Sequence, residues 1–455
     1  MCGVLAVLNK HHHFLKAMDA IAHRGKRQVV METRRGMIGH ARLPIVGIGS
    51  ENDQPFRRGH QYFGFVGEIL DFREKDPTAE CDLQTVVNAW SKEGPSGLRH
   101  HDGFWAVVML DDLAGELHVL CDYLAQKPMY YRVDSFPSVA SEPNALVALA
   151  SVTIDEIYMS SVIKWGYCPD TVRTPYNEIK HVLPGEHVVL NYHGVSRRKI
   201  VDPLCPVTMS EPALKKEIEA AVKRRVLSSD VPVGILISGG LDSSIVYNLA
   251  QRHGKVRPYF ADTEAKDFER DAVYLLMKDV LEPNYHKLTH VDWDADDITK
   301  GLHLMQEPID LGSLLPQCAL ANAVKEDVCL TGDGADEVFG GYGRSTRYDS
   351  QWTDIYHELV AWHLPRLDRI MMSNCIEVRS PFLARQVVQG AMGLPHSRRQ
   401  NKEALRDMFR KDLPIPLADQ PKMPLRSSRI EFDREANSQV LVGLFRSWHE
   451  ETTRR

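Results

Sequence analysis

The sequence lacks the features that mark several specialised classes of protein. Its 8 cysteines include no CxxC pair, which argues against a disulfide framework or a zinc site and predicts reduced thiols in a cytoplasmic protein. No apolar run approaches the ~20 residues that cross a bilayer, and MCGVLAVLNK runs into three histidines without the pattern of a signal peptide. The net charge of -6 disfavours nonspecific binding to nucleic acid or to membrane surfaces.

The chain is long enough for more than one domain, because 455 residues are more than a single hydrophobic core ordinarily organises. In the first half, β-branched and aromatic segments bounded by turn residues predict strands at 3–8, 37–46, 61–69, 104–110, 117–123 and 128–133. Residues 82–94 have helical spacing, with Asp82 placed to cap the helix. The second half alternates apolar segments with long helical patterns, which indicates an α/β domain with a parallel sheet. Prolines cluster at 201–212, so we predict domains of residues 1–205 and 206–455.

The stretch SGGLDSS, residues 238–244, follows the short apolar segment GILI and opens a helical pattern at Leu241. A strand, a glycine turn and a helix N-terminus offer a phosphate free backbone N–H groups and the positive end of a helix dipole. The serine hydroxyls add donors, and Asp242 adds a ligand for magnesium. The stretch is not a Walker A loop, which requires GxxxxGK[ST]. A purely structural glycine turn is the alternative.

A second candidate, VCLTGDGADEVFGGY at 328–342, repeats the order of strand, glycine turn and acidic cluster. Asp333, Asp336 and Glu337 repel one another, so a cation, either magnesium or a substrate amine, is expected to offset their charge. Glu337 stands where a GxGxxG motif needs glycine, so no dinucleotide site is predicted. A solvated acidic loop is the alternative.

Further along the chain, NCIEVRSPFL places Glu377 and Arg379 two residues apart in an extended segment. Both side chains therefore face the same side. They are either candidates for binding a second substrate or partners in a structural salt bridge, and the sequence leaves both interpretations open.

Taken in order, SGGLDSS, GDGADEVFGGY and EVRSPFL closely resemble the synthetase half of the asparagine synthetase family, a PP-loop ATP pyrophosphatase with an α/β parallel sheet of the adenine nucleotide alpha hydrolase-like type. In that family ATP activates the aspartate side chain as an acyl-adenylate, and ammonia then displaces AMP. The resemblance implies ATP as a substrate and Mg²⁺ as its metal. It implies nucleotide contacts at Leu236, Thr331 and Gly332, pyrophosphate contacts at Ser238, Gly239, Gly240, Ser243, Ser244 and Lys422, and magnesium at Asp242 and Asp336. Asp333 stands where bacterial relatives commonly have a glutamate proposed to deprotonate ammonia.

A need for ammonia gives Cys2 a role. If Met1 is removed, the α-amino group of Cys2 can accept the thiol proton, so one residue serves as nucleophile and general base. MCG, AHRG, GHARLPIV, QPF, GEI, CDLQTV, DGFWA and LPGEH resemble a class II glutamine amidotransferase domain, an α+β N-terminal-nucleophile fold with αββα layers. The resemblance implies that glutamine binds at Arg42, Ile45, Val46, Glu68 and Asp82, and that the Gly67 N–H stabilises the oxyanion. One cation and two acids suit a zwitterion.

One catalytic position departs from this pattern. The family has Asn-Gly-Glu where this chain has Val66-Gly67-Glu68, so a side-chain amide that helps stabilise the oxyanion is replaced by a hydrocarbon. Losing one such donor costs about 10²–10³ in rate. We therefore expect Val66 to weaken the glutaminase without abolishing it.

The predicted function is a glutamine-hydrolysing asparagine synthetase, an ATP-dependent carbon–nitrogen ligase, with ammonia passing through an internal tunnel. Its predicted small-molecule partners are glutamine, aspartate and ATP, and no binding of nucleic acid or membrane is predicted. A homodimer is possible, because the sequence does not determine the oligomeric state. One alternative is a related amide-forming ligase acting on another carboxylic acid. Another is a chiefly ammonia-dependent enzyme whose glutaminase is weakened by Val66. A non-catalytic binding protein of the same fold is disfavoured because Cys2, Asp242, Asp333, Asp336 and Lys422 are all retained.

Overall fold

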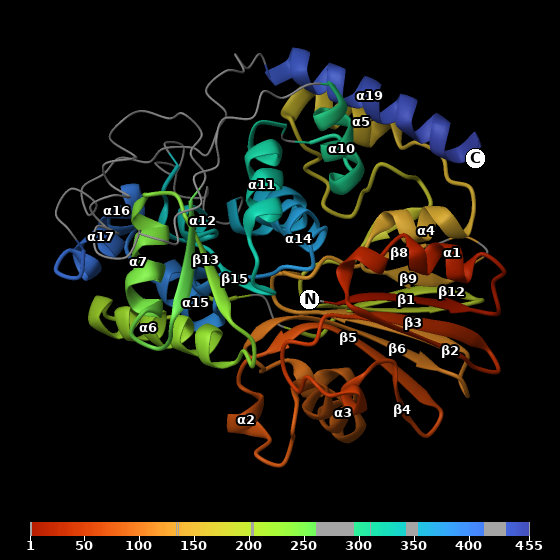
Figure 1. Ribbon diagram of the computed structural model, residues 1–455, viewed down its shortest axis with the longest axis horizontal. Helices are drawn as coiled ribbons and strands as arrows, with labels where there is room; N and C mark the ends of the chain where they lie inside the picture. The colour runs from red at the N-terminus through yellow and green to blue at the C-terminus, as the bar shows by residue number, and fades with distance from the viewer. Residues whose placement is uncertain are drawn as a thin grey trace.

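Three β-sheets organise the computed structural model, which describes residues 2–132, 134, 136–201, 204–260, 295–309, 311–342, 354–413 and 434–454. Two six-stranded antiparallel sheets lie face to face in the first part of the chain, and a four-stranded parallel sheet lies beside them in the second part (Figure 1). The predicted fold class, an N-terminal-nucleophile domain followed by a parallel α/β sheet, is confirmed. The predicted boundary between residues 205 and 206 stays a prediction.

The first sheet has the strand order β10-β8-β9-β1-β3-β2. Every residue of its central strand β1 is buried, because helices α1 and α4 cover one face and the second sheet covers the other (Figure 1). The predicted strand 37–46 ends early, at Arg42, because Pro44 has no N–H for a ladder bond and the following residues turn to line a pocket. The strands are β1 (Gly3–Leu8), β2 (Arg27–Glu32), β3 (Gly36–Arg42), β8 (Tyr130–Arg132), β9 (Ser138–Ala140) and β10 (Ile179–His181).

The second sheet has the order β12-β11-β7-β6-β5-β4. Side chains of both sheets, including Val4, Val66 and Val108, form one apolar cluster between them. Helix α3 (Asp82–Glu93) lies against the outer face, where Trp90 meets Phe63 edge to face. The strands are β4 (Phe56–Arg58), β5 (Gln61–Ile69), β6 (Gly103–Asp111), β7 (Glu116–Cys121), β11 (Glu186–Asn191) and β12 (Gly194–Lys199).

The predicted cap of helix α3 was wrong by one residue. The N-cap residue is Cys81, and Asp82 lies in the first turn, where its carboxylate accepts from the backbone N–H groups of Ile69 and Leu83 at 3.2 and 2.9 Å. Asp82 therefore joins α3 to the end of β5 and does not serve as the cap.

The parallel sheet has the order β14-β13-β15-β16. The chain leaves β13 for β14 on one side and reaches β15 on the other, so the carboxyl ends of β13 and β15 flank the crevice where such sheets bind ligands. The strands are β13 (Val233–Ile237), β14 (Val256–Phe260), β15 (Val328–Leu330) and β16 (Glu377–Arg379). Among the described residues, the α-helices are α1 (Phe14–Asp19), α2 (Phe72–Lys75), α3, α4 (Pro143–Leu149), α5 (Glu156–Trp165), α6 (Glu211–Leu227), α7 (Leu241–Ala250), α10 (Ala295–Met305), α11 (Leu311–Ala323), α12 (Ala335–Phe339), α14 (Leu364–Met372), α15 (Arg385–Met392), α16 (His396–Arg399), α17 (Glu403–Phe409) and α19 (Arg434–Arg454).

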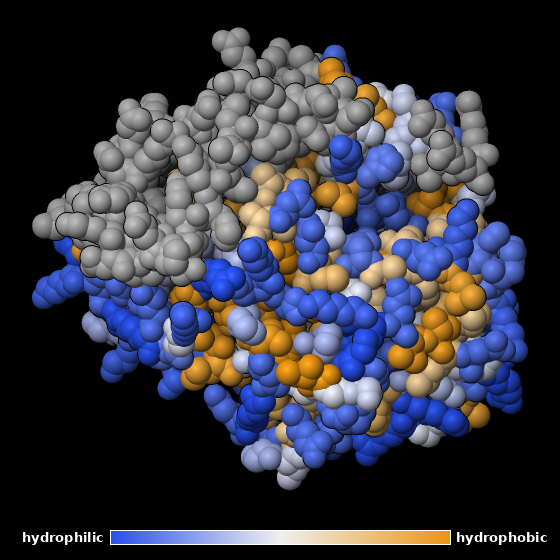
Figure 2. Space-filling view, in the orientation of Figure 1, coloured by the Kyte–Doolittle hydropathy of each residue, from blue (hydrophilic) through white to orange (hydrophobic). Residues whose placement is uncertain are grey.

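The two parts of the chain share buried contacts. Asp368, on helix α14, forms ion pairs with Arg24 at 2.7 Å and with Lys127 at 3.4 Å, and all three side chains are buried. On the outside, hydrophilic side chains cover much of the visible face, with hydrophobic patches between them (Figure 2). Within the described part of the chain, no helix combines the length and the apolar character needed to cross a membrane.

Candidate active sites

A pocket in the first part of the chain brings together Cys2 and the residues expected to bind glutamine. Its volume, counted out to the open mouth, is about 330 Å³, and it lies between β3, β5 and the start of α3. Its lining is Cys2, Arg42, Leu43, Ile45, Val46, Asn52, Gln54, Phe65, Gly67, Glu68, Cys81, Asp82 and Leu83. Segments from residues 2 to 83 thus meet in one cavity, which we call the amide pocket.

Cys2 stands immediately before β1, at the bottom of the amide pocket. Its thiol lies 4.0 Å from the carbonyl oxygen of Leu43, and Arg24 Nε donates to the Cys2 carbonyl oxygen at 3.1 Å. Burial raises the pKa of the Cys2 thiol, so a neighbouring base is needed to ionise it at neutral pH. Arg24 is a positioning residue for Cys2 that sequence reasoning missed, although AHRG was among the quoted motifs.

Arg42 closes one end of the amide pocket. Its guanidinium donates to the backbone carbonyls of Val46, Gly47 and Gly49 at 2.5 to 3.1 Å and to Asp53 Oδ1 at 3.0 Å. Arg42 therefore holds the loop after β3 in place, and a bound carboxylate would have to share these donors.

Glu68 and Asp82 form an acidic corner of the amide pocket, and their carboxyl groups share a hydrogen bond. Burial raises the pKa of Asp82 to about 6. Burial first, and then the charge of Asp82, raise the pKa of Glu68 well above its usual value. Arg379 Nη2, from the parallel sheet, lies 3.8 Å from Glu68 Oε1. The corner favours an additional cation such as an ammonium group.

Gly67 and Val66 fill different roles on β5. Gly67 has φ +98° and a Cβ there would lie 1.9 Å from the carbonyl oxygen of Phe104, so only glycine fits. The side chain of Val66 is completely buried in the cluster between the two sheets, which also contains Cys2. The position that the family fills with an amide thus belongs to the apolar core here.

The amide pocket is also lined by two polar side chains that were not predicted from the sequence as site residues. Gln54 Oε1 accepts from the Phe65 backbone N–H at 2.6 Å, and Asn52 Nδ2 donates to the Gly47 carbonyl oxygen at 3.2 Å. The QPF motif was the only sequence signal for Gln54, and nothing marked Asn52. Both side chains shape the pocket wall.

The second site begins at the carboxyl end of β13. Gly239 has φ +78° in the turn, and the N-cap residue of α7, Gly240, has no side-chain cap, so the first N–H groups of the helix are available to an anion. Ser238 and Ser243 lie 3.2 Å apart through their hydroxyl groups. The buried Ser244 hydroxyl has no hydrogen-bond partner among the described residues. These features suit a phosphate group.

The loop after β15 packs against this turn. A Cβ on Gly332 would lie 2.8 Å from the backbone nitrogen of Ser243, so the two loops approach backbone to backbone. The Thr331 hydroxyl donates to Asp333, and Tyr342 donates to Glu337 Oε1 at 2.6 Å. Leu236 is on β13 itself. The candidate nucleotide residues that the structure describes therefore lie on two neighbouring strand ends.

Asp242 and Asp336, the expected magnesium ligands, face one cation. Lys402 Nζ lies 2.5 Å from Asp242 Oδ2 and 2.6 Å from Asp336 Oδ1. Burial alone would lower the pKa of Lys402, but the two carboxylates raise it above its usual value. Because both oxygens already contact a single positive charge, this pair fits a Mg²⁺ ion, which typically takes one or two carboxylates together with substrate phosphates. No sequence signal marked Lys402, which lies in an ordinary charged stretch.

Glu377 and Arg379 lie on β16 with fully buried side chains, and Arg379 Nε donates to Glu377 Oε1 at 2.7 Å. The salt bridge that the sequence left open is therefore present. Arg379 also donates to the Arg225 carbonyl oxygen and to Ser228 Oγ, both at 2.8 Å, and its free edge faces Glu68 of the amide pocket. A role for this pair in binding a second substrate stays a prediction. Lys422 lies outside the described residues.

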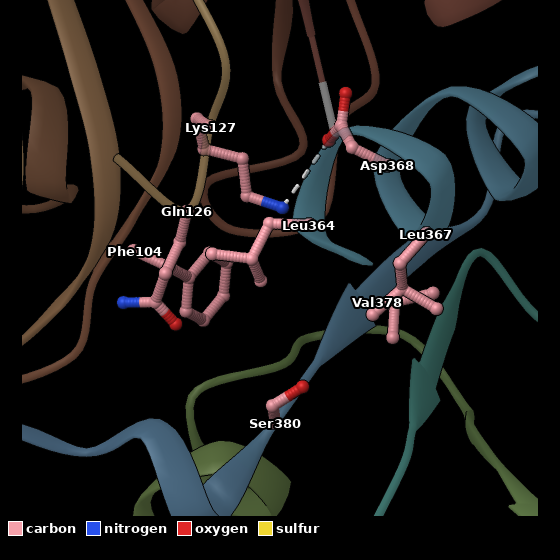
Figure 3. Close-up of a pocket in the computed structure, with 8 residues that line it drawn as sticks. All are labelled: Phe104, Gln126, Lys127, Leu364, Leu367, Asp368, Val378 and Ser380. Carbon is pink, nitrogen blue, oxygen red and sulfur yellow. Dashed lines mark hydrogen bonds and ion pairs between the residues drawn. The ribbon is translucent and has the colours of Figure 1, made fainter. Parts of the chain in front are cut away.

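A second pocket, of about 280 Å³, lies between the two sites (Figure 3). Its lining comes from both parts of the chain: Phe104, Gln126, Lys127, Leu364, Leu367, Asp368, Val378 and Ser380. Lys127 extends across it toward Asp368, with its ammonium 4.9 Å from the centre of the Phe104 ring. Phe104 is the register partner of Glu68, so this connecting pocket adjoins the amide pocket. At its other side, the backbone carbonyl oxygen of Arg379, between Val378 and Ser380, accepts from the Thr331 N–H at 3.1 Å.

Two family profiles match the chain. The asparagine synthase profile matches residues 213–359 and 348–449, and the glutamine amidotransferase domain profile matches residues 1–200. A probable glutamine-hydrolyzing asparagine synthetase of Acanthamoeba polyphaga mimivirus is 25% identical, covering 85% of this chain and 76% of that protein. A putative asparagine synthetase of Methanocaldococcus jannaschii is 24% identical over 75% of this chain and 76% of its own length. Asparagine synthetase 1 of Bacillus subtilis is 26% identical over 75% of this chain and 59% of its own length.

Proposed function

The chain belongs to the asparagine synthase family, and on that premise we propose that it is an ATP-dependent ligase that amidates aspartate with ammonia released from glutamine at Cys2. The observation that supports this most is the convergence of Cys2, Arg42, Gly67, Glu68 and Asp82 on one pocket. The same chain brings SGGLDSS and GDGADE together at two adjacent strand ends.

In the amide pocket, the Cys2 thiolate attacks the side-chain amide carbon of glutamine. Once Met1 has been removed, the α-amine of Cys2 accepts the thiol proton and passes it to the departing nitrogen. A C–S bond forms, the C–N bond breaks, and ammonia leaves behind a thioester that water hydrolyses to glutamate. Glu68 and Asp82 receive the α-ammonium of glutamine, Arg42 receives its α-carboxylate, and the backbones of Ile45 and Val46 complete the grip.

At the second site, the aspartate side-chain carboxylate attacks the α-phosphorus of ATP, and pyrophosphate leaves. The turn from Ser238 to Gly240 and the start of α7 hold the phosphates through backbone N–H groups and serine hydroxyls. Asp242 and Asp336 would hold Mg²⁺, which supplies positive charge that offsets the phosphate oxygens. Ammonia then attacks the acyl carbon, AMP departs, and Asp333 accepts a proton from the attacking nitrogen.

Ammonia made at Cys2 must reach this second site, and the connecting pocket offers a route. It adjoins the amide pocket through the Glu68–Phe104 pair and the loop of Asp333 through the Arg379–Thr331 hydrogen bond. Both ends are buried, so ammonia on this path is kept from bulk water and from protonation there.

One observation favours a second candidate, an enzyme that uses free ammonia for most of its turnover. Val66 is buried in the core and leaves the Gly67 N–H as the oxyanion donor that the family pattern retains at this site. The two candidates share the aspartate and ATP chemistry and differ only in the source of nitrogen.

The test is aspartate-dependent release of AMP, measured once with glutamine and once with ammonium, in the unaltered protein and in Cys2→Ala. We expect AMP with both nitrogen sources in the unaltered protein and with ammonium alone in the variant. AMP release that needs ammonium even in the unaltered protein would select the second candidate. AMP release with another carboxylic acid, and none with aspartate, would contradict the assignment of substrate.

A further inference from the structure

Lys402 occupies the point where the two candidate magnesium ligands meet. Its ammonium lies within 2.6 Å of a carboxylate oxygen of both Asp242 and Asp336, and its side chain is buried. Asp242 lies in the first turn of α7, after β13, and Asp336 lies in the first turn of α12, after β15. One lysine from a third segment therefore holds the starts of these two helices to each other.

The backbone around Lys402 is built to deliver this ammonium. Asn401 and Lys402 both have positive φ, +53° and +59°; asparagine adopts this left-handed conformation readily, whereas it is unfavourable for the lysine. The Asn401 N–H donates to the Gly340 carbonyl oxygen at 3.0 Å and anchors the strained segment to the end of α12. Gly341 leaves space for the Lys402–Asp336 ion pair, because a Cβ at this position would lie 2.3 Å from Lys402 Cε and 1.9 Å from Asp336 Oδ1.

We propose that Lys402 is an internal counter-cation that occupies the magnesium position between Asp242 and Asp336 when no nucleotide is bound, and that the metal displaces it. The proposal rests on the proposed function for the identity of the two ligands. Without a cation, the two partly buried carboxylates, which contact the same ammonium, would repel each other. Lys402 removes that repulsion, and it also lowers the affinity of the empty site for a free metal ion. The metal then binds well only when it arrives with phosphate groups that add ligands and negative charge.

Replacing Lys402 with a neutral residue should change two measurable properties, the affinity for a metal ion and the melting temperature. Removing a unit charge this close to a cation site strengthens metal binding in the absence of nucleotide by about tenfold or more. The same change lowers the melting temperature in chelator, because the two carboxylates then face each other, and Mg²⁺ restores it. A lysine with only a packing role would lower the melting temperature equally with and without Mg²⁺.

The experiment measures Mn²⁺ binding by electron paramagnetic resonance of the free ion, with thermal melts in EDTA and in Mg²⁺, on the full chain. Lys402→Met is compared with the unaltered protein and with Lys215→Met. Lys215, on α6, forms a Lys–Asp pair of the same length with Asp412. We expect tighter Mn²⁺ binding and Mg²⁺-restored melting in Lys402→Met, and neither effect in Lys215→Met.

Lys402→Gln, which keeps hydrogen-bonding groups, replaces the methionine variant if the latter does not fold. If neither folds, hydrogen exchange of the unaltered protein decides, because Mg²⁺ added together with pyrophosphate must alter protection of residues 400–409 as Lys402 leaves. Unchanged Mn²⁺ affinity in a folded variant, or unchanged exchange, overturns the proposal. Adding pyrophosphate distinguishes a failure of the role proposed for Lys402 from a failure of the magnesium site itself. If the unaltered protein then binds Mn²⁺, only the role of Lys402 is wrong; if it does not, the magnesium site of the proposed function is wrong as well.

Discussion

At the scale of single residues, the amide pocket depends on side chains whose neighbours set their chemistry. Cys2 is buried, which raises the pKa of its thiol, and its carbonyl is fixed by Arg24, whose guanidinium also bonds Glu142 and Asp368 at 2.7 Å. The position of the nucleophile is thus tied to a residue of the second part of the chain. Val66 is the one point where this chain's residue works against the expected chemistry.

Replacing Val66 with asparagine should raise the rate of glutamine hydrolysis. The new amide adds an oxyanion donor beside Gly67, and one such donor is worth about 10²–10³ in kcat. Because the site is apolar, the amide also lowers the free energy of unfolding by about 1–3 kcal/mol. Steady-state glutaminase assays and denaturant melts check both effects. Val66→Ala is the control, since it loosens the packing without adding a donor, and equal glutaminase rates in the two variants would contradict the expectation.

The Michaelis constant for glutamine should depend on pH through Asp82. Burial raises the pKa of Asp82 to about 6, so below that pH the group is neutral and attracts the α-ammonium of glutamine weakly. The KM therefore falls as the pH rises through about 6 and then levels off. Asp82→Asn should raise the KM by about tenfold or more and remove this transition. Asp76→Asn, which alters a partly buried carboxyl outside the amide pocket, should retain it, and a transition that survives in Asp82→Asn would count against the assignment.

At the scale of elements, helix α14 joins the two parts of the chain through Asp368. Replacing Asp368 with asparagine leaves the buried Arg24 and Lys127 without their shared carboxylate. We expect the free energy of unfolding to fall by about 3–5 kcal/mol, the cost of breaking a buried ion pair.

Asp407→Asn is the matched control for this change. Asp407 pairs with Arg398 at 2.8 Å but is exposed, so its loss should cost no more than about 1 kcal/mol. Denaturant unfolding of both variants makes the comparison, and equal costs would show that the contact through α14 contributes little.

Elements were easier to predict from sequence than the contacts between them. The strands 3–8 and 61–69 match β1 and β5 residue for residue, because alternation and turn residues are local signals. Helix α3 was displaced by one residue at its cap, and β3 ended at Arg42 before Pro44, where chain geometry overrides composition. The predicted site residues of the amide pocket, such as Cys2, Arg42 and Asp82, came from motifs. Lys402 did not, because its partners Asp242 and Asp336 are far from it in sequence and only folding brings them together.

At the scale of the whole molecule, the proposed function makes the connecting pocket the route that ammonia takes from the amide pocket to the second site. A bulky side chain there should block ammonia without touching either site's chemistry. We expect Ser380→Phe to lose most glutamine-dependent asparagine formation while glutamine hydrolysis and ammonium-dependent synthesis persist, because the ring takes up space in the pocket that Ser380 lines.

Ser380→Ala, which does not fill the pocket, is the control and should keep glutamine and asparagine production coupled. Equal losses of glutamine-dependent and ammonium-dependent synthesis in Ser380→Phe would mean that the ring disturbs the second site, and unchanged coupling would mean that ammonia takes another route.

The central claim is that one chain moves nitrogen from glutamine to aspartate internally, and isotope transfer tests it most directly. Glutamine labelled with ¹⁵N in its side-chain amide is supplied with aspartate, Mg²⁺ and ATP in an excess of unlabelled ammonium, and the asparagine formed is analysed by mass spectrometry. Internal transfer predicts asparagine enriched in ¹⁵N well beyond the labelled fraction of free ammonium, and no enrichment in Cys2→Ala. Asparagine whose label merely matches the free ammonium pool would contradict the account.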